Sequence, residues 1–181
     1  HFDLTTSTPE GLGAKLLAVN LSDIAAMGGA PREAFLAMSA SPDFDATILE
    51  RLVGGLQASG FRFGVQLAGG DTTSTHGPLV LTLTMIGSCR PDRVIYRSGA
   101  SVGDSVFVTG YPGESAAGLD LSSKTSRLDP GDREHLLRRH HRPEPRLAIG
   151  QGLADRGIAS SMIDVSDGLA GDLAHICRQS A

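Results

Sequence analysis

Three short acidic motifs in the 181-residue sequence contain the side chains best suited to binding metal ions and phosphates. They are Asn20-Leu21-Ser22-Asp23, Gly69-Gly70-Asp71-Thr72-Thr73 and Asp164-Val165-Ser166-Asp167-Gly168. Their carboxylate and hydroxyl oxygens are hard donors of the kind that Mg²⁺ prefers. Taken together, and without a cysteine or histidine cluster, the motifs favour a carboxylate magnesium site for nucleotide phosphates over redox, zinc or covalent catalysis.

Each motif also has a simpler interpretation when it is considered alone. The Gly-Gly-Asp segment could be an exposed turn, and the Asn-Leu-Ser-Asp segment could be a hydrated helix face or a helix that ends early at Ser22. Ser166 or Asp167 could do no more than cap the helix that follows. However, Asp164 at a strand tip and Asp167 in a first helical turn would lie where a helix N-terminus also attracts phosphate.

Basic side chains supply a second set of candidates. Arg97, in the string YRSG, could contact a phosphate with its planar guanidinium group, or it could be an ordinary surface arginine. The string RRHHRPEPR, residues 138–146, concentrates arginine and histidine at a predicted helix end. We interpret it mainly as a solvated helix terminus, with phosphate binding as the alternative.

The composition excludes several classes of function. Sixteen basic and 20 acidic side chains give a formal charge of -4, which disfavours binding to nucleic acid. No P-loop motif is present, and Cys89 and Cys177 fit neither a disulfide framework nor a zinc site. No apolar run approaches the roughly 20 residues of a membrane span, and residues 1–10 do not resemble a signal peptide. We therefore expect a cytoplasmic protein with neither nucleic-acid nor membrane partners.

The hydrophobic pattern predicts an alternation of helices and strands. We expect helices at residues 7–27, 45–59, 114–121, 132–140, 145–155 and 167–178, and strands at residues 33–40, 65–68, 79–88, 105–109 and 159–164. Ser7 and Glu10 have the spacing of a capping box, Gly60 should close the second helix, and Gly69-Gly70 should form a turn. Residues 122–132 should form an exposed loop. A change in composition near Gly99 predicts two domains, residues 1–98 and 99–181.

Several strings resemble those of the thiamine-monophosphate kinases in the same order and at similar separations. They are VNLSDIAAMGGAP, LAGGDTT, YRSGA, VFVTGYPGESAAGL, RHHRPEPR and IDVSDGLAGDLAHI. The resemblance extends to the wider superfamily of aminoimidazole-ribonucleotide synthetase, selenophosphate synthetase and a hydrogenase-maturation protein. It implies an α+β fold of two α/β units, in which an N-terminal mixed sheet carries its helices on one face.

The resemblance also implies an activity and a set of site residues. The implied enzyme transfers the γ-phosphoryl group of ATP directly to thiamine monophosphate, giving thiamine diphosphate with the help of several Mg²⁺ ions. Magnesium ligands would be Asp23, Asp71, Asp164 and Asp167, and ATP contacts would come from Gly70, Asp71, Arg97 and Ser166. His1 would contact the thiamine phosphate, whereas no residue is identified as a catalytic group with certainty.

Further expectations follow from the family pattern. Its members dimerise through strands of their N-terminal domains, which join into a barrel, and the strand expected at residues 79–88 has a threonine face that would need covering. They also carry a G-D-D motif and an S-T-D strand before the equivalent of His1, and a GGEDYEL-like region after the equivalent of residue 181. We therefore expect residues 1–181 to be truncated at both ends, with an incomplete second unit, and to be inactive alone. The alternatives are another ATP-using enzyme of this superfamily and a noncatalytic magnesium-nucleotide binding fragment.

Overall fold

The computed structural model describes residues 2–123 and 127–181, and the chain divides into two compact units. The first unit contains residues 1–21 and 31–88, and the second contains residues 22–30 and 89–181. Helix α1, Pro9–Ala26, contributes residues to both units. The division into domains at residue 98 stays a prediction.

Helix α1 begins and ends close to the positions that the sequence predicts. Its first turn is capped by Thr8, whose Oγ1 accepts a hydrogen bond of 3.1 Å from the Gly11 amide. The Glu10 half of the predicted Ser7–Glu10 capping box is not formed, because the Glu10 carboxylate pairs with Arg51, with Nε and Oε1 2.6 Å apart, and the Ser7 amide donates to the carbonyl oxygen of Asp3. At the other end Gly28 adopts a φ of 71°, a left-handed conformation that glycine reaches without steric cost.

A mixed three-stranded sheet forms the base of the first unit. The strands are β1 (Ala30–Ala40), β2 (Gln66–Ser74) and β3 (Val80–Ser88), in the order β2-β1-β3. Strands β1 and β2 are parallel, because helix α2 (Ala46–Phe63) returns the chain to the same end of the sheet. In β3, Leu83 is buried whereas Thr82 and Thr84 are exposed. This confirms the predicted alternation along the strand.

Helix α2 is longer than the sequence pattern predicts. Asp45 caps its N-terminus by accepting a hydrogen bond of 2.9 Å from the Thr47 amide. The helix passes through Gly60 and ends at Gly64, whose φ of 68° makes it the left-handed C-cap. The prediction that Gly60 closes the helix is wrong, because the buried Gly60 instead gives room to the returning chain: a β-carbon at Gly60 would lie 2.8 Å from the carbonyl oxygen of Val65.

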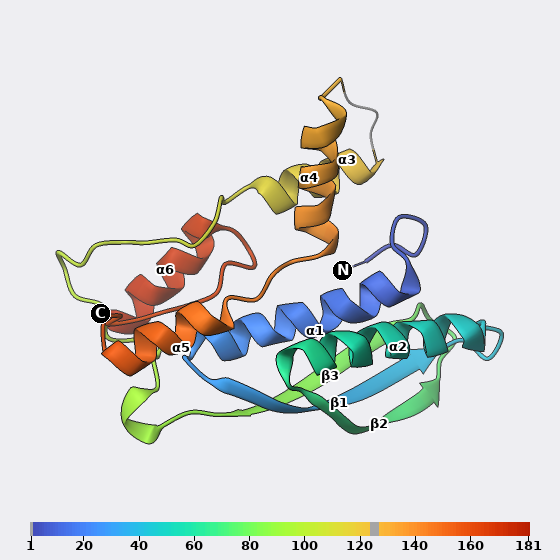
Figure 1. Cartoon of the computed structure of the whole chain (residues 1–181), viewed down its shortest axis with the longest axis horizontal. Helices are drawn as coiled ribbons and strands as arrows, with labels where there is room; N and C mark the ends of the chain where they lie inside the picture. Colours follow the sequence, from blue (N-terminus) through green and yellow to red (C-terminus); the bar gives the residue numbers. More distant parts are fainter. Residues whose placement is uncertain (1, 124–126) are drawn as a thin grey trace. The chain divides into compact units, whose positions relative to one another are not determined.

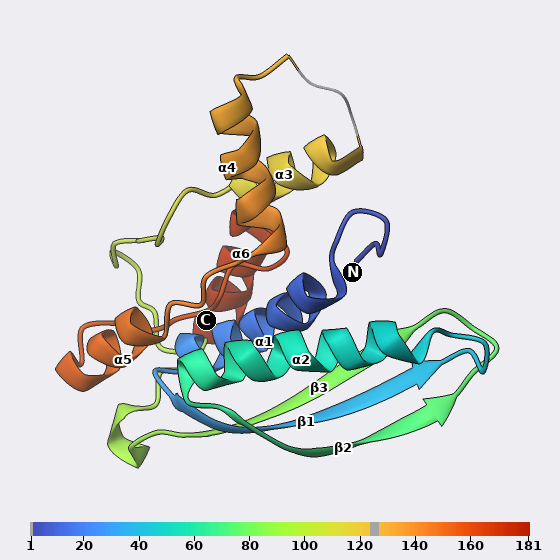
Figure 2. The same cartoon turned by 45° about the vertical axis from the view of Figure 1, so that its right-hand side comes forward.

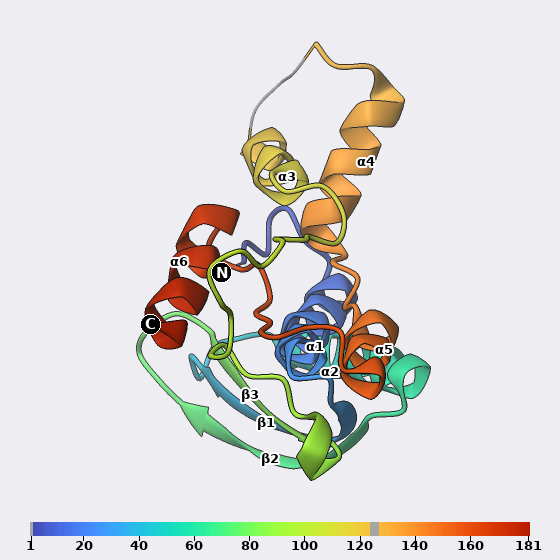
Figure 3. The same cartoon turned by 90° about the vertical axis from the view of Figure 1, so that its left-hand side faces the viewer.

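Helix α2 and the part of α1 within the first unit cover one face of the sheet (Figures 1 and 2). The two helices approach closely, since a β-carbon placed on Gly55 of α2 would lie 2.1 Å from the carbonyl oxygen of Glu10 in α1. The largest fully buried side chains are Leu17, Leu21, Leu52 and Leu56, all of them on these two helices. The view along the sheet in Figure 3 shows that β1, β2 and β3 leave their other face uncovered within this unit. The predicted one-sided arrangement of helices is therefore confirmed.

Strand β2 contains the Gly69-Gly70-Asp71 segment, so the predicted turn at Gly69-Gly70 is wrong. The parallel ladder with β1 continues through these residues and pairs Gly70 with Leu36 and Asp71 with Ala37. A β-carbon on Gly70 would lie 1.8 Å from the Leu36 carbonyl oxygen, which explains why glycine is needed within this strand. The register shifts just before this point, because Ala34 pairs with Leu67 whereas Phe35 pairs with Gly69. Ala68 is therefore an extra residue of β2, which makes a β-bulge.

The second unit is mainly helical, and its helices confirm the predicted ones with small shifts at their ends. They are α3 (Glu114–Ser123), α4 (Pro130–His141), α5 (Leu147–Arg156) and α6 (Leu169–Ser180), whereas the short 3₁₀ helix η1 (Pro91–Arg93) is an addition that the sequence pattern does not predict. Helices α3 and α4 pack on each other, and Glu114 joins them by contacts to His135 and Arg139 of α4. The loop predicted at residues 122–132 includes residues 124–126, which lie outside the described residues.

Two strands predicted in the second unit are not formed. The structure assigns neither residues 105–109 nor residues 159–164 to a strand, and Thr109 and Ser160 lie in bends. An extended segment becomes a strand only when a neighbouring segment completes its hydrogen-bond ladder. Between residues 89 and 181, outside the gap at 124–126, the structure assigns no such ladder, and Phe107 is 90% exposed. The prediction of strands at these two segments is therefore wrong.

Helices and strands together confirm the predicted α+β class. Over the described ranges, none of the helices has both the length and the apolar character required to cross a lipid bilayer.

Candidate functional site

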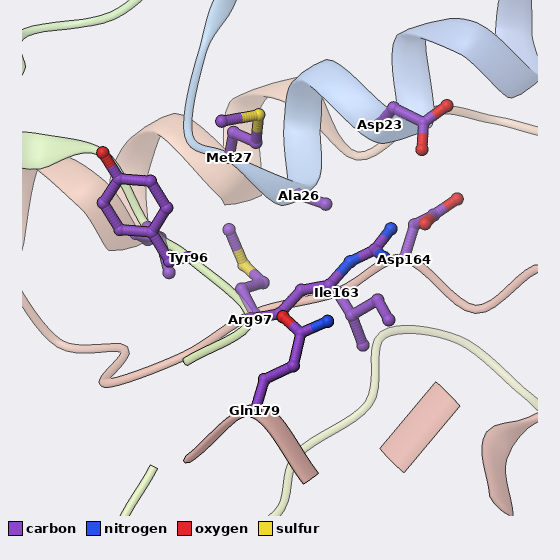
Figure 4. Close-up of a pocket in the computed structure, with 10 residues that line it drawn as sticks. Asp23, Ala26, Met27, Tyr96, Arg97, Ile163, Asp164 and Gln179 are labelled. Carbon is purple, nitrogen blue, oxygen red and sulfur yellow. The ribbon is translucent and has the colours of Figure 1, made fainter. Parts of the chain in front are cut away.

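One pocket of the second unit brings together three of the predicted site residues. Asp23, Arg97 and Asp164 line a cavity of about 230 Å³ together with seven further residues: Ala26, Met27, Ile95, Tyr96, Met162, Ile163 and Gln179. In Figure 4 the Arg97 side chain extends toward Asp164, with Asp23 on the neighbouring turn of α1. The cavity is smaller than the roughly 300 Å³ or more of typical small-molecule pockets. It therefore suits a charged group or an ion better than a whole nucleotide.

Helix α1 supplies Asp23 because it continues past the polar residues in its second half. Leu21 and Ala25 are buried, and they anchor the apolar side of this part of the helix. Asn20 satisfies its own amide by donating a hydrogen bond of 2.8 Å to the carbonyl oxygen of Leu16. The alternative of a helix that ends at Ser22 is therefore wrong, and Asp23 is presented on an intact helical turn.

Backbone hydrogen bonds hold the segments that carry Arg97 and Asp164 beside the turn of α1 that carries Asp23. The Ile95 amide donates to the carbonyl oxygen of Met27 at 3.3 Å, and the Met162 amide donates to the carbonyl oxygen of Tyr96 at 3.0 Å. The segment that carries Arg97 is thus tied both to the end of α1 and to the segment that leads into Asp164. Side chains from three distant parts of the sequence are brought to one place by these main-chain links.

The charges in the pocket are unbalanced in a way that favours a cation. Desolvation by the surrounding chain raises the pKa of Asp23, and the negative charge of Asp164 raises it further. The nearby positive charge of Arg97 opposes this effect and lowers the same pKa. A divalent cation placed between the two carboxylates would offset the repulsion that the charge of Asp164 exerts on Asp23. The donor set therefore fits Mg²⁺, which commonly takes one or two protein carboxylates plus phosphate oxygens.

Ser166 and Asp167 lie just after Asp164, in the loop that precedes α6. The N-cap position of α6 is Gly168, and it has no side-chain capping bond. The interpretation in which Ser166 or Asp167 only caps the helix is thus wrong. Both residues are exposed, while their backbone amides donate to the buried carboxylate of Asp172. Their hydroxyl and carboxylate groups are therefore available to a ligand.

Other predicted site residues lie elsewhere in the chain or outside the described residues. Gly70 and Asp71 belong to β2 of the first unit, where Asp71 is exposed and its Oδ1 accepts from the Thr72 amide at 2.9 Å. His1 lies outside the described residues. Over residues 2–123 and 127–181, no group of three or more His, Cys, Asp or Glu side chains could hold a metal ion. The metal and ligand roles of all these residues stay predictions.

The basic string at residues 138–146 lies at the C-terminus of α4 and in the segment that follows. Cations stabilise a helix at this end, which supports the interpretation as a solvated terminus. Arg139 is in addition engaged by Glu114, with Nε and Oε2 2.7 Å apart.

Sequence reasoning missed several residues of the pocket. Met27, Tyr96, Met162 and Gln179 line it, but none of them is among the site residues that the sequence predicts. Asp172 was missed too, although a signal was present: on α6 it falls three residues after Leu169 and four before Ile176, on the apolar stripe. An acidic residue on such a stripe indicates a specific buried partner.

Comparisons with known proteins agree with these observations. Residues 1–89 match the family model for the N-terminal domain of AIR synthase related proteins. Thiamine-monophosphate kinase of Escherichia coli strain K12 is 46% identical over 181 residues, which are 99% of this chain and 54% of the relative. The chain thus spans about half the length of the curated relatives it matches.

Solved structures give the same result. The crystal structure of thiamine-monophosphate kinase from Stenotrophomonas maltophilia superposes with a TM-score of 0.86 at 36% identity, over 99% of this chain and 57% of that one. A structure described as AaThiL complexed with AMPPCP and TMP also has a TM-score of 0.86, at 30% identity, over 96% of this chain and 54% of that one. Along nearly its whole length the chain is therefore similar to thiamine-monophosphate kinases, and residues 1–89 match the N-terminal domain of AIR synthase related proteins.

Proposed function

We propose that the complete protein to which this chain belongs phosphorylates thiamine monophosphate to thiamine diphosphate, using ATP and Mg²⁺ by direct phosphoryl transfer. The observation that carries this proposal is the meeting of Asp23, Arg97 and Asp164 at one small charged pocket. The names of the relatives support the reaction, and the complex of one relative with AMPPCP and TMP supports an adenine nucleotide and the thiamine phosphate as its ligands.

The residues of the pocket have distinct roles in this proposal. Asp23 and Asp164 hold magnesium, which when bound neutralises charge on the phosphates. Arg97 contacts the phosphate oxygens of ATP, for which a planar guanidinium is well suited. Ser166 and Asp167 extend the set of oxygen donors from the loop before α6. Because phosphoryl transfer asks for positioning and charge neutralisation, this arrangement needs no covalent intermediate on the protein.

The family resemblance also assigns ligand contacts to Gly70 and Asp71, which belong to β2 of the first unit. The close approach of the Gly70 backbone to β1 leaves the strand free of a side chain at that position, next to the exposed carboxylate of Asp71. We assign Asp71 to magnesium and Gly70 to the phosphates. The proposed contact of His1 with thiamine monophosphate rests on the family resemblance alone.

The decisive experiment measures ADP release by the complete protein with ATP, Mg²⁺ and candidate acceptors. We expect turnover with thiamine monophosphate but not with formylglycinamidine ribonucleotide or selenide, which are acceptors of other superfamily members. Asp23→Asn should weaken magnesium-dependent binding of AMPPCP by about 10- to 100-fold, whereas Asp155→Asn, an exposed carboxylate of α5 outside the pocket, should leave it unchanged. Turnover with another acceptor alone would contradict the proposal.

A noncatalytic role in binding magnesium and nucleotide is the second candidate for residues 1–181 by themselves. It is favoured by the small volume of the pocket and by the finding that no three ligating side chains cluster over the described ranges. Calorimetry separates the two functions, because a binding module takes up Mg²⁺ and AMPPCP without any ADP release from ATP.

We further propose that the protein is a homodimer joined through the sheets of its first unit, as the family resemblance implies. The uncovered face of this sheet carries apolar side chains, with Phe35, Val80 and Ile86 at least one-third exposed. Such a face on a soluble domain is commonly covered by a partner.

A further inference from the structure

Asp172, in the first turn of α6, is the one polar or charged residue that is buried among those the structure describes. It is 3% exposed. A carboxylate removed from water is costly unless hydrogen bonds compensate the loss of hydration. Its surroundings therefore show what the side chain does.

The compensation comes from the backbone of the loop before α6. Oδ2 of Asp172 accepts a hydrogen bond of 3.0 Å from the Ser166 amide and one of 3.2 Å from the Asp167 amide. Bonds between an ionised carboxylate and backbone amides are stronger than bonds between neutral groups. The first turn of the helix, where a negative charge is favoured, adds further stabilisation. One buried oxygen thus holds two successive peptide groups.

These two peptide groups belong to the residues that we assign to ATP and magnesium. Because Asp172 engages only their main chain, the side chains of Ser166 and Asp167 stay exposed. The loop connects directly to Asp164 in the pocket, and it enters α6 through Gly168, whose φ of 111° is strained for other residues. Without the carboxylate, two unpaired amides and a flexible glycine would leave this loop poorly fixed.

We propose that Asp172 is a positioning residue, which orders the loop of residues 164–168 for magnesium-nucleotide binding without touching the ligand. The proposal rests on the proposed function of this loop. Residues that do not bind a metal themselves often orient the side chains that do. Mutation of such a residue commonly weakens metal binding by about 10- to 100-fold, and we assign this role to Asp172.

The test compares Asp172→Ala and Asp172→Asn with Asp132→Ala in the complete protein. Asp132 is an exposed carboxylate in the first turn of α4, so its removal reproduces the loss of a charge near a helix N-terminus without disturbing the pocket. Calorimetry measures binding of AMPPCP with Mg²⁺, and nuclear magnetic resonance follows hydrogen exchange of the Ser166 and Asp167 amides. ADP release gives KM for ATP and kcat separately.

We expect Asp172→Ala to weaken AMPPCP binding by about 10- to 100-fold and to speed exchange of both amides, with KM for ATP rising more than kcat falls. Asp172→Asn keeps an oxygen acceptor but loses the charge, so its effects should lie between those of Asp172→Ala and the unmodified protein. Asp132→Ala should change none of these quantities.

Unchanged exchange of the two amides in Asp172→Asn or Asp172→Ala would overturn the positioning role. So would faster exchange in a folded variant whose AMPPCP affinity stays within about twofold of the unmodified protein. If Asp172→Ala fails to fold, the asparagine variant still decides the question. If the unmodified protein itself shows no magnesium-dependent AMPPCP binding, the proposed function fails instead, and the exchange measurement alone reports whether Asp172 holds the loop.

Discussion

The negative charge of Asp164 disfavours the charged form of Asp23, and this effect can be tested without any ligand. Replacing Asp164 by asparagine removes a negative charge that raises the pKa of Asp23, so that pKa should fall. Replacing Arg97 by glutamine removes the charge that lowers it, so the pKa should rise. Carbon-detected magnetic resonance of the Asp23 carboxyl during a pH titration measures both shifts. An Asp23 pKa that stays constant in both variants would show that the three side chains do not share one electrostatic site.

The raised pKa of Asp23 also predicts how magnesium binding depends on pH. A carboxyl with a raised pKa retains its proton to higher pH, and protons compete with metal ions for the same oxygens. Magnesium binding should therefore strengthen as the pH rises through the pKa of Asp23.

At the scale of elements, two adjacent glycines of α2 allow the effect of backbone entropy on stability to be measured separately from the effect of packing. A β-carbon on Gly54 meets nothing within 4 Å, whereas one on Gly55 would lie 2.1 Å from the carbonyl oxygen of Glu10. Gly54→Ala should increase the free energy of unfolding by about 0.5–1 kcal/mol because alanine loses less entropy in a helix. Gly55→Ala should decrease it by about 1–3 kcal/mol because α1 must move away. Urea unfolding of both variants measures the difference, and equal effects would contradict the close approach of α1 and α2.

The ion-pair cluster between α3 and α4 should make stability depend on pH. Hydrogen bonds and charge from His135, followed by Arg139, hold the pKa of the Glu114 carboxyl below its usual range. A carboxyl with a lowered pKa in the folded state stabilises the fold above its unfolded pKa, and this contribution is lost as the pH falls through the folded pKa.

Glu114→Gln should therefore lower the Tm near neutral pH by about 2 °C or less, and the difference from the unmodified protein should shrink in acid. Calorimetric scans at several pH values measure the effect. Glu134→Gln, which removes an exposed carboxylate from α4, is the matched control and should shift the Tm little at any pH. A Glu114→Gln difference that grows in acid would contradict the assignment.

The helices were predictable from the sequence because their caps and apolar periodicity are local. Gly28 and Asp45 mark helix ends wherever the chain is placed, and the structure confirms both. The segments at residues 65–74 and 105–109 were misjudged because strand formation depends on a distant partner. Hydrogen bonds to β1 keep Gly69 and Gly70 within strand β2, whereas residues 105–109 are not assigned to a strand. The convergence of Asp23, Arg97 and Asp164 depends on main-chain hydrogen bonds such as the one from Ile95 to Met27. Such bonds cannot be predicted from residue types, because every residue except proline can donate them.

At the scale of the whole molecule, the proposed dimer gives a prediction about mass. Light scattering after size-exclusion chromatography should give twice the mass of one chain for the complete protein. Ile86→Lys, which places a charge on the outer face of β3 where Ile86 is 45% exposed, should shift the mass toward one chain. Phe61→Lys should leave it unchanged, since Phe61 is an exposed apolar residue of α2 and not of the sheet. A stable monomer in the unmodified protein would rule out this mode of assembly.

The extra residue Ala68 in β2 determines which surface of the sheet the following residues, Gly69-Gly70-Asp71, face. Side chains alternate between the two surfaces of a sheet, so the parity of the residue count decides which surface each one reaches. Ala68 shifts that parity just before Gly69-Gly70-Asp71, and Asp71 thereby shares the uncovered surface with its partner Ala37. Excision of this single alanine would turn the carboxylate toward the helices while leaving the acidic motif itself unaltered. The surface of the sheet that Asp71 faces is thus set by how many residues precede it, and not only by which ones.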